Sequence, residues 1–451
     1  MSAKITFYGG AGSVTGANFL FDTGSKRILV DCGTHERENI CDPANHAPFA
    51  YDAKTIDALV ITHAHQDHIG RVPKLIREGF RGPIYSTPAT RDLSAIMFED
   101  GLRVMQREAE RLGCEVLYEE QDVAGALNLW QTHDYHEPFS IGDASVEFFD
   151  AGHILGSAMA RFTRNGRNIF FTGDLGNSPE PLLSDTENPE GANYLLMESV
   201  YGDRVHEERD SRTEVLRHAI EETANRNGTL LIPSFSLERT QVLLYEIHLL
   251  IEQGKLKPIS VYLDAPLAER ITEVFRTFRG LLNKHAQESF MKGDIFSFPG
   301  LVEVMTTGHS REIHEKKNPK VIIAGAGMSS GGRIRAHEKQ YLPDPNVTLL
   351  FTGYQAPGSL GRRIQDGEKN VMIDGVRTPV RARVDSLTGY SGHKDRDGLL
   401  AFVESAGESL KKVFVVMGEP KASAFLAQRI QDFLGIDAVA PEAMQSAEID
   451  F

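Results

Sequence analysis

Three histidines and one aspartate crowd into six positions of this chain, directly after a short apolar segment. The residues are His63, His65, Asp67 and His68, and the run 58–61 before them is typical of a buried strand. Side chains two apart on an extended chain point the same way, so His63 and His65 can bind one metal ion together. If the chain turns after His65, Asp67 and His68 can face a second ion, as in two-metal hydrolysis. A solvated, histidine-rich turn is the alternative, and the density of ligands after a buried strand argues against it.

Further ionisable residues stand where later strand-like segments end beside glycine. They are His153, Asp174 and Glu198. Strand ends that face one edge of an α/β sheet gather functional groups on a rigid support. Taken singly, each is an ordinary turn residue; with the first cluster they complete a set of metal ligands. Asp31 also closes a strand, where it either orients a ligand histidine or simply caps the turn.

The bulk composition is that of an ordinary globular protein. The chain has 451 residues, of which 25% are charged and 41% hydrophobic, a length that favours roughly two to three domains. No run approaches the ~18 apolar residues that span a bilayer, and the first residues lack the apolar core of a signal peptide. The sequence therefore predicts a cytoplasmic protein with no membrane association.

The net charge limits the kinds of binding partner, and the cysteine pattern limits the thiol chemistry. A net charge of −15 argues against broad electrostatic attraction to nucleic acid, but it allows basic groups confined to a cleft. The three cysteines, Cys32, Cys41 and Cys114, lack the spacing of a metal finger. We interpret them as buried or idle thiols.

The pattern of expected helices and strands changes along the chain. Short segments with close glycines, at 5–8, 19–21 and 28–31, predict an antiparallel meander. From about Ser211, which opens a capping box with Glu214, longer helices alternate with strands, and this predicts a doubly wound domain inserted between about 207 and 350. Its glycine- and serine-rich stretch around Ser330 can present backbone N–H groups to a phosphate, although tight turns often have this composition.

Together these motifs resemble the β-CASP branch of the metallo-β-lactamase superfamily, and the resemblance covers nearly the whole chain. Asp31 matches the first motif of the family, and the string from His63 to His68 matches the second. The remaining motifs fall, in order, on His153, Asp174, Glu198 and His393, the last within Ser-Gly-His-Lys-Asp.

The resemblance implies a fold and a ligand set. The expected fold is α/β, a metallo-β-lactamase αββα sandwich interrupted by a doubly wound β-CASP domain, with the site in the cleft between them. The implied domains are residues 1–206, 207–350 and 351–451, the first and last forming the sandwich. It also implies two Zn²⁺ ions per chain: His63, His65 and His153 on the first, Asp67 and His68 on the second, and Asp174 bridging them.

The sequence departs from the family pattern at Met417. Catalytic members carry a histidine there, in a His-Gly-Glu string, whereas this chain reads Met417-Gly418-Glu419. A thioether binds Zn²⁺ poorly compared with imidazole, so we expect a weaker second zinc. His35 and His46 are conceivable auxiliary ligands, with ordinary surface histidines as the alternative.

The resemblance implies a zinc-dependent ribonuclease that hydrolyses RNA phosphodiester bonds with a metal-activated hydroxide. Asp67 or Asp174 could accept the proton of water, and His393, oriented by Glu198, could protonate the leaving oxygen. The expected partner is single-stranded RNA, with a homodimer as one assembly state. Candidate phosphate contacts are Ser330, Arg333, Arg362 and Arg363.

Three other functions compete with this interpretation. Met417 favours a catalytically weakened or silent RNA-binding or scaffold paralogue, although the other metal ligands are all retained. A hydrolase of small esters, thioesters or lactams could use the same residues, but the inserted domain would cover an open pocket. A DNA nuclease on the same scaffold is the third.

Overall fold

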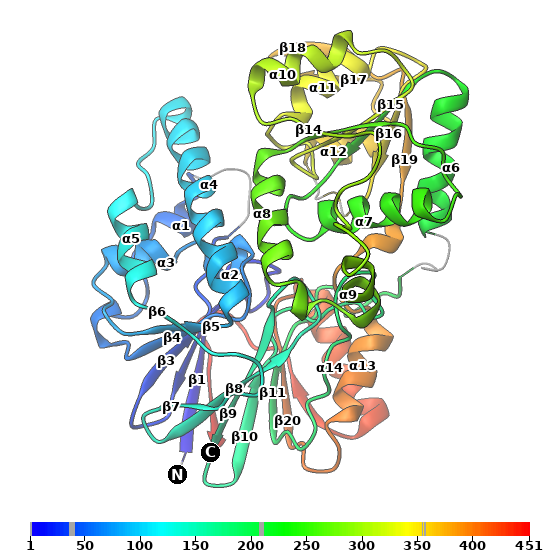
Figure 1. The fold of residues 1–451 in the computed structure, drawn as a ribbon. Coiled ribbons are helices and arrows are strands. Elements are labelled where there is room, and N and C mark those ends of the chain that lie inside the picture. Colours follow the sequence, from blue (N-terminus) through cyan, green and yellow to red (C-terminus); the bar gives the residue numbers. More distant parts are fainter. Residues whose placement is uncertain (1, 36–40, 207–211, 354, 356–357) are drawn as a thin grey trace. The chain divides into compact units, whose positions relative to one another are not determined.

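The computed structural model describes residues 2–35, 41–206, 212–353, 355 and 358–451 (Figure 1). The chain divides into two compact units. The first consists of Met1–Val205 and Gly392–Phe451, and the second of His206–Ser391. Each unit has its own sheets and its own apolar core.

The first sheet of the first unit begins with the predicted meander. Strands β1 (Ser2–Gly9), β2 (Asn18–Asp22) and β3 (Arg27–Val30) pair antiparallel, and β22 (Ser446–Asp450) lies antiparallel beside β1. The sheet continues in parallel through β4 (Ala58–Val60), β5 (Ile84–Ser86) and β6 (Trp130–Thr132). The apolar run before His63 is therefore a buried inner strand, as predicted.

The second sheet also has seven strands. Strands β7 (Phe139–Ile141), β8 (Ala144–Asp150), β9 (Ala158–Arg164) and β10 (Arg167–Phe171) pair antiparallel in chain order. Strands β11 (Tyr194–Met197), β20 (Lys412–Val415) and β21 (Asp437–Val439) extend the sheet in parallel beyond β10. The segment after residue 391 thus returns to the first unit and completes its second sheet.

Apolar side chains hold the two sheets together. The ring of Phe21 lies 5.4 Å from that of Phe162 and 5.6 Å from that of Phe171, so the first sheet packs directly on the second. On the outer face of the second sheet, apolar residues of α13 (Arg396–Ser405) and α14 (Pro420–Leu434) join its strands in a separate core. Helices α3 (Val72–Arg77), α4 (Pro88–Leu112) and α5 (Glu120–Asn128) lie beside the first sheet (Figure 1). The expected αββα sandwich is confirmed.

The second unit is a parallel, doubly wound sheet, as predicted. Its strand order is β14-β13-β15-β12-β16-β19. The strands are β12 (Thr229–Pro233), β13 (Ser260–Asp264), β14 (Leu301–Glu303), β15 (Lys320–Ala324), β16 (Thr348–Phe351) and β19 (Arg383–Ser386). Its helices are α6 (Arg212–Asn225), α7 (Arg239–Glu252), α8 (Pro266–Thr277), α9 (Lys284–Phe290), α10 (Thr307–Glu312), α11 (Ile334–Tyr341) and α12 (Leu360–Gln365), with a hairpin of β17 (Asn370–Ile373) and β18 (Val376–Pro379).

The second domain boundary differs from the expected one. The unit ends at Ser391, beyond the expected position 350, because β16 and β19 pair with each other in its sheet. Ser211, the proposed first residue of a capping box, lies outside the described residues, and α6 is described from Arg212.

The cysteine prediction was wrong for two of the three residues. Cys41 and Cys114 form a disulfide, with Cα atoms 5.9 Å apart and a sequence separation of 73. Folding brings the segment after residue 40 against the end of α4, a proximity that spacing alone does not reveal. Cys32 is a buried free thiol, as predicted. Within the described ranges, every helix is too short or too polar to span a bilayer.

Candidate metal centre

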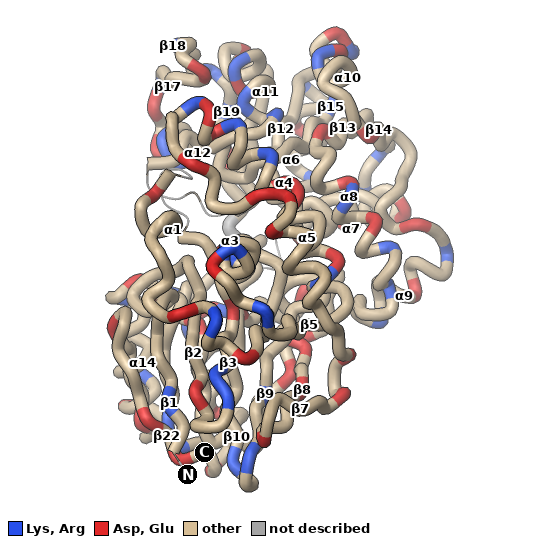
Figure 2. Tube along the Cα trace, turned by 90° about the vertical axis from the view of Figure 1, so that its left-hand side faces the viewer, with Lys and Arg blue, Asp and Glu red and all other residues tan. Residues whose placement is uncertain are grey.

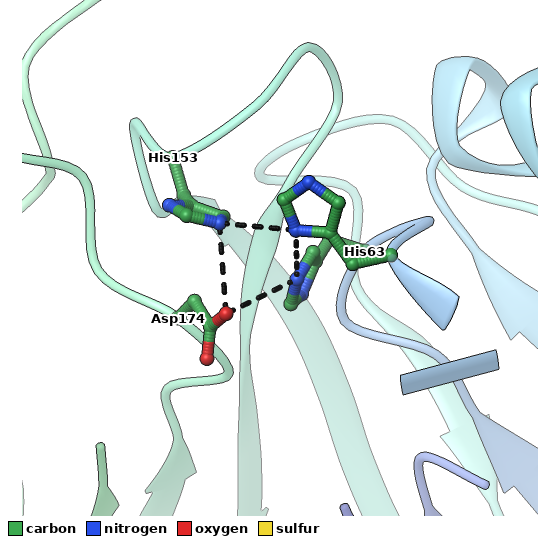
Figure 3. Close-up of side chains that lie close together, drawn as sticks. His63, His153 and Asp174 are labelled. Carbon is green, nitrogen blue, oxygen red and sulfur yellow. Dashed lines mark hydrogen bonds and ion pairs between the residues drawn. The ribbon is translucent and has the colours of Figure 1, made fainter. Parts of the chain in front are cut away.

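Four ligand atoms converge at the edge of the sandwich. His63 Nε2 and His153 Nε2 lie 3.1 and 3.2 Å from His65 Nδ1. Asp174 Oδ2 lies 3.4 Å from His63 Nε2 and 3.5 Å from His153 Nε2, and Figure 3 shows these side chains directed at one another. Tetrahedral zinc ligands, each roughly 2.1 Å from the ion, lie roughly 3.4 Å from one another. The four atoms therefore fit the coordination shell of one ion, and we call them the first group.

A tight turn after His65 presents the next two side chains. His65 is the extended residue before the one-turn helix α2 (Gln66–Ile69), and its carbonyl accepts from the N–H groups of His68 and Ile69. The loop is tied down because Ala17 N–H donates to the carbonyl of Asp67 at 2.9 Å. Gly33 permits this packing, since a Cβ there would lie 1.5 Å from Asp67 O. The chain thus makes the turn that allows Asp67 and His68 to face a second ion.

Asp67, His68 and Asp174 form the second group. Their ligand atoms lie within 4.8 Å of one another, and His68 Nε2 is 3.3 Å from Asp174 Oδ1. Both of these atoms are buried and make no hydrogen bond to the residues that the structure describes. Buried polar atoms usually have a partner, so the pair is suited to a cation between them.

Asp31 orients His68 through its second ring nitrogen. Its carboxylate accepts from Thr62 N–H and Thr62 Oγ1, both at 2.8 Å, and lies 2.7 Å from His68 Nδ1. This bond places the proton on Nδ1 and leaves Nε2 free to bind a metal. Of the two roles left open for Asp31, orientation of a histidine is confirmed. Sequence reasoning missed Thr62, whose only signal is its place between the strand and His63.

The electrostatics keep the first group suited to a cation. Burial, with His63 as a neighbour, holds the pKa of His65 well below its usual value, and burial and His393 do the same for His153. Although burial opposes it, His68 and His63 hold the pKa of Asp174 well below the usual range. Neutral imidazoles beside an ionised carboxylate are the ligand forms that a divalent ion requires.

Glu198 and His393 lie directly beside the first group. His393 Nδ1 is 3.0 Å from Glu198 Oε1 and 4.0 Å from Asp174 Oδ2. Glu198 is fully buried and also accepts from the N–H of Leu175 at 2.7 Å. Burial works against protonation, but the Glu198 carboxylate raises the pKa of His393 to about 9. His393 can therefore carry a proton at neutral pH.

Met417 packs into the core between the sheets. It is 2% exposed and belongs to the cluster that includes Phe19. Its sulfur lies so close to Gly10 that a Cβ there would be 2.5 Å away. Its N–H donates to Gly10 O at 2.6 Å, and its φ is +47°, unusual for this residue type. The thioether thus fills apolar space, and the second group has three ligand residues.

The other sequence candidates have different surroundings within their own units. Among the described residues, neither His35 nor His46 belongs to a group able to hold an ion. The Arg333 guanidinium bonds to Asp264 and to the carbonyls of Val304 and Met305.

The remaining candidate phosphate contacts lie elsewhere in the second unit. Arg362 pairs with Asp366 and Arg363 with Glu368, each arginine side chain being 41% exposed. Ser330 is exposed. The arginine pairs within the chain were not visible in the sequence, because its residue types do not show which carboxylate each one meets.

Two facing sheets covered by helices, with histidine and aspartate ligands gathered at one edge, define the metallo-β-lactamase fold. The family model of the metallo-beta-lactamase superfamily matches residues 14–234. The Beta-Casp domain model matches residues 240–364, and that of the Zn-dependent metallo-hydrolase RNA specificity domain matches residues 377–441.

Known proteins match along nearly the whole chain. Ribonuclease TTHA0252 of Thermus thermophilus is 38% identical over 417 residues, which cover 92% of this chain and 93% of that protein. The transcription termination factor FttA of Methanosarcina mazei is 32% identical, over 99% of this chain and 71% of its own. A protein of unknown function from Enterococcus faecalis shares the fold, with a TM-score of 0.60, 14% identity and full coverage of both chains. The chain belongs to the β-CASP family of metallo-hydrolases.

Proposed function

We propose that this protein is a zinc-dependent ribonuclease that hydrolyses single-stranded RNA in the cytoplasm. The observation that carries the proposal is the convergence of His63, His65, His153 and Asp174 on one point, with a second group beside it. The similarity to a named ribonuclease over 92% of the chain supports RNA as the substrate class. When bound, zinc supplies Lewis acidity toward the phosphodiester and makes water a stronger nucleophile at neutral pH.

Two zinc ions are the proposed complement, with unequal affinities. The first group offers three imidazoles and one carboxylate oxygen, a complete tetrahedral shell. The second offers Asp67, His68 and the other oxygen of Asp174, because Met417 supplies no nitrogen. We therefore expect the second zinc to bind more weakly and to exchange faster.

The proposed proton transfers use residues around the two groups. Asp67, with a side chain 19% exposed, is the proposed general base toward water. His393 is the proposed general acid, since the Glu198 carboxylate holds its Nδ1 and raises its pKa to about 9, so that the ring carries a proton at neutral pH. A positioning role for Glu198 follows from its complete burial.

The proposed contacts to RNA are local, because the protein is acidic overall. In the view of Figure 2 basic and acidic residues are interspersed over both units. Arg362, Arg363 and Ser330 stay as proposed phosphate contacts, since their side chains reach solvent. For Arg333 we propose instead that it holds the segment at Val304 and Met305 in place, because its guanidinium bonds to Asp264 and to the carbonyls of these two residues.

The test is zinc content per chain, paired with cleavage of generic single-stranded RNA and single-stranded DNA. The ribonuclease should bind between one and two zinc ions and cleave RNA. His153→Ala should abolish cleavage, whereas His314→Ala, in the second unit, should not. RNA binding without cleavage at full zinc loading would favour the silent paralogue that Met417 suggests, and cleavage of DNA alone would favour a DNA nuclease.

A further inference from the structure

A polar cavity lies in the first unit, next to the backbone of Asp31. Its volume is about 130 Å³, and none of the residues of the two metal groups lines it. Asn18, Tyr51 and Arg71 form its buried part, with exposed fractions of 1%, 8% and 6%. The amide of Asn18 donates to the carbonyl of Asp31 at 3.0 Å, so the cavity adjoins the segment that follows β3.

Arg71 brings a buried positive charge to this cavity. Its Nε donates to Gly33 O, and its guanidinium carbon lies 5.3 Å from the centre of the Phe49 ring. No carboxylate of the described residues lies within 4 Å of it, and its terminal nitrogens make no hydrogen bond to them. The neighbouring Lys74, by contrast, is paired with Glu78 at 3.2 Å. A buried charge usually has a partner, so Arg71 is poised for an anion.

Two further polar atoms in the cavity complement an oxyanion. The hydroxyl of Tyr51 and Oδ1 of Asn18 are buried, and neither atom makes an aligned hydrogen bond within the described ranges. Burial raises the pKa of Tyr51 well above its usual value, and the neighbouring Asn18 side chain offsets this only in part, so the hydroxyl stays a donor. The Tyr51 hydroxyl can donate a hydrogen bond to an anionic oxygen, whereas Asn18 Oδ1 can only accept one and therefore needs a protonated oxygen of the ligand. A partly protonated oxyanion such as hydrogen phosphate offers both kinds of oxygen. The guanidinium fork matches its geometry.

We infer that this cavity binds a small oxyanion of the phosphate type, held by Arg71, Tyr51 and Asn18. An engineered cavity of similar volume, about 150 Å³, accommodates benzene, so a phosphate group fits. The phosphate can come from free inorganic phosphate or from the end of a nucleotide whose remainder passes the exposed rim at Ala47 and Ala50.

Isothermal titration of the zinc-loaded protein with inorganic phosphate tests the inference. Tyr51→Phe removes one donor without changing the ring, and should weaken binding by roughly tenfold or more. Arg71→Lys keeps the charge but loses the fork, and should weaken it further. Tyr118→Phe is the matched control, because Tyr118 is another buried tyrosine of this unit that does not line the cavity. It should bind phosphate as the wild type does.

A second titration separates this cavity from the metal centre. The His153→Ala variant should keep the phosphate affinity of the cavity. If His153→Ala lost phosphate affinity while Tyr51→Phe bound phosphate as tightly as the wild type, the inference would be overturned. Absence of any phosphate binding would overturn it as well. Adenosine monophosphate identifies the source: tighter binding than inorganic phosphate, lost in Tyr51→Phe, assigns the cavity to nucleotides, and equal binding assigns it to free phosphate.

Discussion

Replacing Asp31 by asparagine should weaken the second metal group selectively. The carboxylate accepts three hydrogen bonds, two from Thr62 and one from His68 Nδ1. Asparagine has nearly the same shape but only one acceptor atom, so its amide N–H must face either Thr62 N–H or His68 Nδ1. In the second case His68 moves its proton to Nε2, the atom that should bind zinc.

The size of the effect follows from the bond that is lost. A hydrogen bond to a charged group is worth about 1.5–3 kcal/mol. Loss of a carboxylate that orients a ligand histidine typically costs about 10–100-fold in metal affinity. We therefore expect zinc at the second group to bind at least about tenfold more weakly in Asp31→Asn. The first group should change little, because Asp31 is not among its ligands.

Competition with a zinc chelator, resolved into two binding steps, measures both affinities. Asp264→Asn is a matched control: its carboxylate lies 2.7 Å from His337 Nε2, fully buried in the second unit. It should lower the free energy of unfolding without changing either zinc affinity. If Asp31→Asn bound the second zinc as tightly as the wild type, the orienting role of Asp31 would be refuted.

Three further predictions concern other parts of the chain. Met417→His should raise the zinc content toward two ions per chain, because an imidazole supplies the nitrogen that the thioether lacks and histidine tolerates the positive φ of this position. Met417→Leu is the control, and an unchanged zinc content in Met417→His would contradict the account. Gly33→Ala should displace the loop of Asp67 and weaken the second zinc, whereas Gly280→Ala, with open space around it, should not; equal affinities in a chelator titration would refute this. Burial raises the pKa of Glu338 from 4.5 to about 8. The folded state therefore keeps a proton that the unfolded chain releases above pH 4.5, and the free energy of unfolding falls as the pH rises from 4.5 toward 8. Glu338→Gln should remove this loss, about 3 kcal/mol at pH 7, and denaturant unfolding at pH 5 and pH 8 should show a flatter profile than the wild type.

The sequence was sufficient to identify side chains that the structure brings together as candidate metal ligands, because most of them are close in sequence. His63, His65, Asp67 and His68 stand within six positions after a buried strand, and the structure brings His153 and Asp174 to the same point. Strand ends at one sheet edge meet wherever the intervening chain goes. The role of Asp31 could not be chosen from the sequence, because a turn-capping and an orienting aspartate occupy the same place at a strand end.

Features that depend on long-range pairing were beyond the sequence. Strands β16 and β19 have four residues each, and such short runs do not show which sheet they join; the sequence placed the end of the inserted domain at 350, whereas the compact unit continues to Ser391. The partner of Arg333 is separated from it by 69 positions. The same holds for Cys41 and Cys114, whose proximity depends on how α4 ends.

The disulfide encloses the first ligand cluster in a covalent ring. His63, His65, Asp67 and His68 all lie between Cys41 and Cys114, 73 positions apart. Closing a ring of this length restricts the unfolded chain by about 4 kcal/mol in the chain-entropy model. The bond also limits the conformations of the segment that carries these four residues, so an opened sandwich that still holds the bond loses less entropy when it closes again on zinc. The oxidation state of Cys41 and Cys114 is thereby linked to the retention of zinc. Reduction of the disulfide should speed the loss of zinc in mild denaturant.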